Sequence, residues 1–160
     1  IPDYSNNINY EVELVLKINK TGKHIEERFA HKYYSEIGLG IDFTARDIQE
    51  ECKNNGLPWE KAKGFDGSAQ ISQRFIEKTG LDISNIQFSL FKNKDKVQYG
   101  NSKDMIFNFE KIISYLSKFY TLKMGDLIYT GTPSGVGSIT KGDKLTGFIE
   151  QEEMLNVNIK

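Results

Sequence analysis

The chain has 160 residues, enough for one domain with one sizeable hydrophobic core. Lys plus Arg (21) nearly balances Asp plus Glu (22), so the charge does not favour binding to nucleic acid or to an anionic membrane. No apolar run approaches membrane-spanning length, and the single cysteine, Cys52, excludes an internal disulfide. We therefore expect an ordinary soluble domain from a reducing compartment.

In the first part of the chain, the pattern predicts strands around one clear helix. Residues 10–18 alternate between apolar and polar or charged positions with period two, which indicates a strand. Residues 25–34 favour a short helix, and residues 37–42 form an extended apolar segment with two glycines. The stretch Thr44-Ala45-Arg46-Asp47 resembles a capping box and predicts a helix to about Asn54.

The second part of the chain predicts more strands and one amphipathic helix. Residues 65–80 favour mostly loop with a short helix. The later elements that we expect are a hairpin over 86–99, a helix over 109–119 and strands over 126–130, 144–150 and 154–159. Many short strands, few helices and glycine-rich turns predict a β-dominated α+β fold in a single domain over residues 1–160.

Glu11 and Glu13 are the first candidates for chemistry. Alternate residues of a strand lie roughly 7 Å apart on one side, so both carboxylates could reach one cation above the strand. Ligation by oxygen alone favours a hard ion such as Mg²⁺, Mn²⁺ or Ca²⁺ over zinc. The alternative is a solvent-facing strand whose charges have no special role.

Asp42 and Lys63 are two further candidates. Asp42 lies between Ile41 and Phe43, at the end of an apolar segment, where a carboxylate needs a partner such as a metal ion. It could equally be a turn residue before the next helix. A lysine beside a metal could stabilise a developing enolate, although most lysines are simply solvated.

The glycine-rich segment 131–137 follows a predicted strand. Such turns can direct backbone N–H groups at an anion, but this one lacks the ending of a phosphate-binding loop and could be a tight connection. His24 and His31 lie in a polar region without a carboxylate or cysteine pattern, which favours surface roles. No serine has the setting of a nucleophile elbow.

These pieces, taken in order, resemble the fumarylacetoacetate hydrolase family. The Glu11-Val12-Glu13-Leu14 strand and the stretch from Asp42 to Gln49 are similar to its signatures. Further similar stretches follow in the family's order, at 57–66, 104–107, 121–126 and 130–137. The closest subgroup is the small acylpyruvase and oxaloacetate decarboxylase type.

The resemblance implies a mixed β-roll, a homodimer and one divalent ion, most simply Mg²⁺, per subunit. It implies that Glu11, Glu13 and Asp42 are the metal ligands. The implied substrate contacts are Lys63 at the oxo or enolate oxygen, Gln49 as an orienting group, and Thr132 with the backbone at Gly131 around the substrate carboxylate. Arg46 and Asp47 are implied to be structural.

The implied reaction is hydrolytic cleavage of an acylpyruvate-type 2,4-dioxo acid to pyruvate and a carboxylic acid. The alternatives on the same site are oxaloacetate decarboxylation, tautomerisation of a 2-oxo acid, and binding without catalysis. In the family's hydrolases, a His and a Glu on an upstream lid activate water, and the present sequence begins after that segment. We expect a cytoplasmic protein, although an upstream targeting segment stays open.

Overall fold

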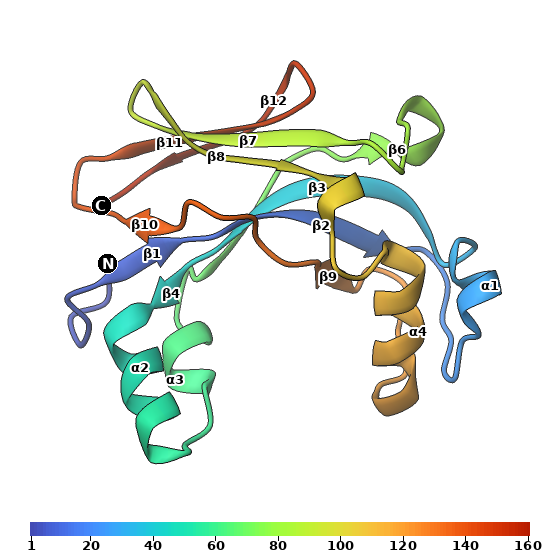
Figure 1. The fold of residues 1–160 in the computed structure, drawn as a ribbon, viewed down its shortest axis with the longest axis horizontal. Coiled ribbons are helices and arrows are strands. Elements are labelled where there is room, and N and C mark those ends of the chain that lie inside the picture. The colour runs from blue at the N-terminus through green and yellow to red at the C-terminus, as the bar shows by residue number, and fades with distance from the viewer.

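The computed structural model describes residues 1–160 and consists of three sheets and four short helices (Figure 1). The central sheet has the order β5 (Ala69–Ile71), β3 (Tyr34–Asp42), β2 (Val12–Ile18), β9 (Leu127–Tyr129), with β6 (Ile76–Glu77) also paired to β3. The second sheet has the order β12 (Glu152–Asn158), β11 (Lys144–Ile149), β7 (Gln87–Lys92), β8 (Asp95–Asn101). The smallest has the order β10 (Gly137–Ser138), β1 (Ile8–Tyr10), β4 (Thr44–Ala45).

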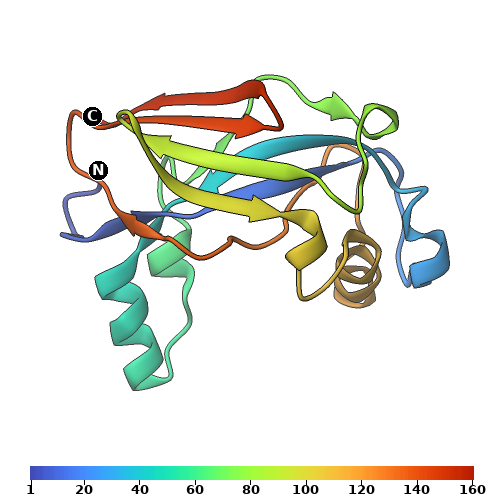
Figure 2. The same cartoon turned by 45° about the horizontal axis from the view of Figure 1, so that its top comes forward.

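The helices are α1 (Glu27–Ala30), α2 (Arg46–Asn55), α3 (Glu60–Lys63) and α4 (Phe109–Phe119), with short 3-10 turns η1 (Lys78–Gly80) and η2 (Ser102–Asp104). In Figures 1 and 2, the four-stranded sheet lies across one face of the central sheet. The α2–α3 pair and the α4–α1 pair project from the other side, at opposite ends of the molecule (Figure 2). None of the helices is long and apolar enough to cross a membrane.

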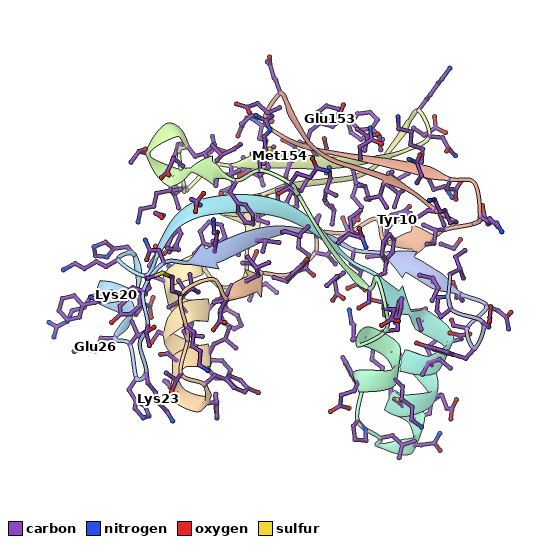
Figure 3. All side chains as sticks on the ribbon, turned by 180° about the vertical axis from the view of Figure 1, so that it is seen from behind. Tyr10, Lys20, Lys23, Glu26, Glu153 and Met154 are labelled. Atoms are coloured by element: carbon purple, nitrogen blue, oxygen red, sulfur yellow. The ribbon has the colours of Figure 1, made fainter.

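One apolar core joins the sheets. It contains 27 buried residues, most of them from strands of all three sheets, with further contributions from α1, α4 and the connections. The four-stranded sheet approaches the central one closely at Gly147, where an added Cβ would lie 2.6 Å from Leu39 Cδ2. Figure 3 places Glu153 and Met154 on β12, Tyr10 at the end of β1, and Lys20, Lys23 and Glu26 in the connection between β2 and α1.

The strand over 37–42, the helix over 109–119 and the hairpin turning at Asn93 are confirmed. The β-dominated fold is confirmed as well, and every strand pair in it is antiparallel. The helix predicted over 25–34 was wrong beyond one turn, because Tyr34 begins β3 and its buried hydroxyl donates to Glu110.

Two further expectations need correction. Residues 65–80 contain strands β5 and β6 and the turn η1, because both strands add to the edges of β3. The capping box is absent, since Ala45 is the N-cap residue of α2 without a side-chain bond. The Thr44 hydroxyl instead donates to the Asp42 carbonyl and accepts from Lys63.

Candidate metal centre

Three acidic side chains meet where the small sheet joins the central sheet. Glu11 separates β1 from β2, Glu13 lies in β2, and Asp42 ends β3. The Asp42 N–H donates to the Glu11 carbonyl at 2.9 Å, which fixes the two strand ends side by side. One carboxylate oxygen from each acid lies within 4.8 Å of the other two, close enough for all three to bind one ion.

Two cationic side chains contact the cluster, Lys63 at both Glu11 and Asp42 and Arg46 at Glu11 alone. Lys63 Nζ lies 2.9 Å from Glu11 Oε2 and 2.7 Å from Asp42 Oδ2, and Arg46 holds Glu11 Oε1. Burial opposes the charge on Glu11, but the bonds from Lys63 and Arg46 outweigh it and lower its pKa. Burial likewise opposes the charge on Lys63, and the two carboxylates outweigh it and raise the Lys63 pKa.

Glu13 has no cationic partner. Its Oε2 accepts the Gly131 N–H at 2.7 Å, and the residue is 5% exposed. Burial, with the charges of Asp42 and Glu11, raises its pKa to about 7. The cluster thus has three carboxylates and two cationic side chains, and its donors to an ion are all oxygen. This combination suits a hard divalent cation, which would compensate the remaining negative charge.

Gln49 lies beside the cluster on the first turn of α2. It is 4% exposed, and its Oε1 accepts from Arg46 Nη1 at 2.7 Å. Arg46 therefore connects the Glu11 carboxylate to Gln49, and its Nε also donates to Asn9 at 3.3 Å. The Gln49 amide nitrogen donates to no protein group, so it is available to a ligand.

The predicted anion loop runs along β2. Its Gly131 N–H is used by Glu13, and the Thr132 hydroxyl donates to the Val12 carbonyl at 2.9 Å. The backbone N–H groups of Thr132 and Ser134 make no hydrogen bond within the protein. The unpaired donors of this loop are therefore backbone groups, whereas the Thr132 hydroxyl is already bound to Val12.

Tyr129 is a neighbour of the cluster that the sequence did not indicate. Its hydroxyl donates to the Gln70 carbonyl at 2.8 Å, so the ring crosses from β9 over β2 and β3 to β5. Burial and the charges of Asp42 and Glu13 raise its pKa to about 12. The Tyr129 ring fits here because Gly40 has no side chain. An added Cβ at position 40 would lie 2.4 Å from Tyr129 Cε1.

The remaining candidates lie apart from the cluster. His24 and His31 are exposed, as expected for surface residues. Cys52 is buried in α2 and has no metal-binding neighbours. The sequence did point to Glu11, Glu13, Asp42, Lys63 and Gln49, which the structure brings together. It missed Tyr129 and the bridging position of Arg46.

The fold and the cluster define a β-rich domain built around a candidate site for a hard cation. The sequence model described as fumarylacetoacetate (FAA) hydrolase C-terminal matches residues 1–160. The chain belongs to the fumarylacetoacetate hydrolase family.

Two relatives carry the name oxaloacetate tautomerase. Mitochondrial oxaloacetate tautomerase FAHD1 of Mus musculus is 41% identical and covers 100% of this chain and 72% of its own length. Oxaloacetate tautomerase YcgM of Escherichia coli K12 is 43% identical and covers 91% of this chain and 67% of its own length.

Two solved structures share the fold. Fumarylpyruvate hydrolase from Pseudomonas aeruginosa, in complex with Mn²⁺ and pyruvate, matches with a TM-score of 0.93 and 33% identity, over 99% of this chain and 68% of that one. The 5-carboxymethyl-2-hydroxymuconate delta-isomerase from Mycobacterium smegmatis matches with a TM-score of 0.90 and 26% identity, over 99% and 61%. These matches confirm the family and the fold that the motifs predicted.

Proposed function

We propose that this domain is the catalytic part of a divalent-metal-dependent enzyme that acts on small 2-oxo acids. The observation that carries the proposal is the convergence of Glu11, Glu13 and Asp42, with the ammonium of Lys63 at its edge. A purely structural role would not require three carboxylates to be clustered and partly buried, because each loses hydration there.

Glu11, Glu13 and Asp42 would hold the ion, with Mg²⁺ as the first candidate and Mn²⁺ or Ca²⁺ as alternatives. A bound hard cation would polarise the 2-oxo group and stabilise negative charge on its oxygen. Lys63, 2.7 Å from Asp42, is placed to donate to the same oxygen. Gln49 would orient the acid through its free amide nitrogen, and the N–H groups at Thr132 and Ser134 would bind its carboxylate.

Tautomerisation of oxaloacetate is the reaction that we propose first. It moves one proton between C3 and the 2-oxo oxygen and needs no attacking water. Its support is that two relatives above 40% identity carry this name.

Hydrolysis of an acylpyruvate is the second candidate. Its support is the fumarylpyruvate hydrolase structure that binds Mn²⁺ and pyruvate. It additionally requires a water molecule and a base to activate that water, and all three carboxylates of the cluster would already be ligands of the ion. The homodimer expected from the family resemblance stays a prediction.

The test is a substrate panel on the full-length protein with Mg²⁺, with Mn²⁺ and with EDTA. For a tautomerase, the enol absorbance of oxaloacetate should relax faster with metal, without formation of pyruvate. A hydrolase would release pyruvate and acetate from acetylpyruvate, and a decarboxylase would release CO₂ from oxaloacetate. If no 2-oxo acid is converted at any metal concentration, or if EDTA has no effect, the proposal is wrong.

Two lysines of α3 provide a matched pair. Lys63→Met should lower kcat/KM by at least about 100-fold, because it removes the ammonium that would donate to the reacting oxygen. Lys61→Met, an exposed position on the same helix, should change kcat/KM by less than about twofold. Equal effects of the two substitutions would remove Lys63 from the mechanism.

A further inference from the structure

Gln98 is a buried polar residue outside the carboxylate cluster. It lies in β8, in the four-stranded sheet, and is 2% exposed. Its Oε1 accepts the Val12 N–H at 3.0 Å, and its Nε2 donates to Thr132 Oγ1 at 2.9 Å and to the Pro133 carbonyl at 3.0 Å. One side chain therefore connects β8, the metal-binding strand and the anion loop.

These bonds replace strand pairing that ends early. The β2–β9 ladder ends at the Val15–Tyr129 pair, and the chain after β9 continues beside β2 without regular pairing. The Thr130 N–H still donates to the Leu14 carbonyl, but at Val12 side chains satisfy the backbone of β2. The Gln98 amide oxygen accepts the Val12 N–H, and the Thr132 hydroxyl donates to the Val12 carbonyl. Val12 lies between the candidate ligands Glu11 and Glu13.

The irregular pairing has a consequence for the cluster. Because the Thr132 hydroxyl binds the Val12 carbonyl, no backbone N–H of the loop donates to that carbonyl. The Gly131 N–H is thereby free to bind Glu13, and the Thr132 N–H stays available. Gln98 fixes this arrangement through the Thr132 hydroxyl. Its Nε2 donates to the hydroxyl oxygen, so the hydroxyl proton is directed at the Val12 carbonyl.

A second contact holds the loop against the same part of β8. The register of β7 and β8 shifts between the Leu90–Gln98 and Phe91–Lys96 pairs, which leaves Val97 unpaired in a β-bulge. Gly135 has a φ of +99° and packs on this bulge, where an added Cβ would lie 2.6 Å from the Val97 carbonyl oxygen. The bulge and Gln98 thus contact the loop at two points.

We propose that Gln98 is a positioning residue for the binding of the 2-oxo acid, which it orients through Thr132 and Val12 without touching it. This inference rests on the proposed function, because it assigns the loop to the carboxylate of that acid. A purely structural Gln98 would affect folding but would leave the affinity of the folded, metal-loaded protein unchanged.

The experiment compares Gln98→Met with Gln73→Met in the full-length protein. Gln73 is an exposed glutamine without a side-chain hydrogen bond. Pyruvate binding is titrated by calorimetry at saturating Mn²⁺, after the Mn²⁺ affinity of each variant has been measured alone. For Gln98→Met, the pyruvate Kd and the KM should rise by about tenfold, as expected for the loss of positioned hydrogen bonds, with kcat changed by less than about threefold.

A double-mutant cycle tests whether the effect passes through Thr132. If it does, Thr132→Val and Gln98→Met should be non-additive in the pyruvate Kd, because either change removes the same hydroxyl geometry. If Gln98→Met does not fold, Gln98→Glu replaces it, since a carboxylate still accepts the Val12 N–H but, when ionised, cannot donate to Thr132 or Pro133. This variant should also weaken pyruvate binding.

The outcomes separate the two proposals. If the wild type binds pyruvate and Gln98→Met binds it as tightly as Gln73→Met does, the positioning role is wrong and the proposed function stands. A fully additive cycle would likewise exclude action through Thr132. If the wild type neither binds pyruvate nor converts any 2-oxo acid, the proposed function fails and this inference fails with it.

Discussion

At Glu13, burial and two neighbouring carboxylates act in the same direction. The unfolded chain would ionise this residue near its usual pKa of 4.5, whereas the folded chain raises the pKa to about 7. The raised pKa means that folding favours the neutral form of Glu13. The folding stability that depends on this neutral form is fully present below pH 4.5 and is lost as the pH rises through 7. The ionised carboxylate needed by a metal is therefore destabilising until the ion binds.

Glu13→Gln should consequently stabilise the metal-free protein at high pH. In EDTA at about pH 8.5, we expect a free energy of unfolding about 2 kcal/mol above that of the wild type, because a neutral amide replaces a buried charge and can still accept the Gly131 N–H. At pH 4.5, the usual pKa of a glutamate, the difference should be small. Urea denaturation at the two pH values measures it.

The control for this change is Glu77→Gln, at an exposed position of β6. It should alter the free energy of unfolding by less than about 0.5 kcal/mol at either pH. If Glu13→Gln were less stable than the wild type at the higher pH, the ionised Glu13 carboxylate would have to be a net stabilising group, and burial could not be what raises its pKa.

At the scale of elements, the central sheet is shaped to place one aromatic ring beside the acids. Glu13 on β2 pairs with Gly40 on β3, and Val15 pairs with Tyr129 on β9. Paired residues point to the same face, so a side chain at position 40 would occupy the space that the Tyr129 ring fills. The glycine at position 40 therefore has a steric role.

Gly40→Ala should push the Tyr129 ring off the cluster. The added Cβ would lie 2.4 Å from Tyr129 Cε1 and 2.9 Å from the Gln70 carbonyl oxygen, and the backbone atom cannot easily move. We expect a loss of about 1–3 kcal/mol in stability and a weaker Mn²⁺ affinity. Thermal unfolding with and without Mn²⁺ provides both measurements.

Gly80→Ala is the matched substitution, because no atom lies within 4 Å of the place that its methyl group would take and the φ of Gly80 is not positive. It should be neutral or slightly stabilising, by up to about 1 kcal/mol, since alanine restricts the unfolded chain. Similar losses for the two substitutions would contradict a specific role for Gly40.

At the scale of the whole molecule, three sheets share one core. The apolar core of 27 buried residues includes Leu14 from the central sheet, Leu145 from the four-stranded sheet and Ile8 from the small sheet. If one sheet separated, the apolar faces that it covers on the other sheets would be exposed to water. We therefore expect the three sheets to unfold together. The α2–α3 pair is joined to this core by β4, which precedes α2 directly.

Cooperative unfolding can be tested with two probes. Trp59, the only tryptophan, lies at the start of α3 and reports on the α2–α3 pair, while far-ultraviolet circular dichroism reports on the whole backbone. The two urea transitions of the metal-free protein should coincide. A Trp59 transition at lower urea would show that α2–α3 opens separately, and Lys63 and Gln49 would then leave the cluster before the sheets unfold.

The sequence predicted those elements whose signal is local. Period-two alternation located β2, which carries Glu13 and directly follows Glu11, and the amphipathic stripe located α4. It failed at β5, β6 and the start of β3, because these segments are extended only through pairing with a distant strand. Short strands of this kind carry too little pattern of their own.

For the site, the sequence by itself determined the chemical kinds of side chain: three carboxylates, a lysine and a glycine-rich turn in the order typical of the family. Only the tertiary structure decided which of their atoms meet. It left Glu13 without a cationic partner, gave the Thr132 hydroxyl to Val12, and brought Gln98 from another sheet to join them. Such contacts join residues far apart in the chain, and their geometry depends on how the sheets pack, which no local pattern records.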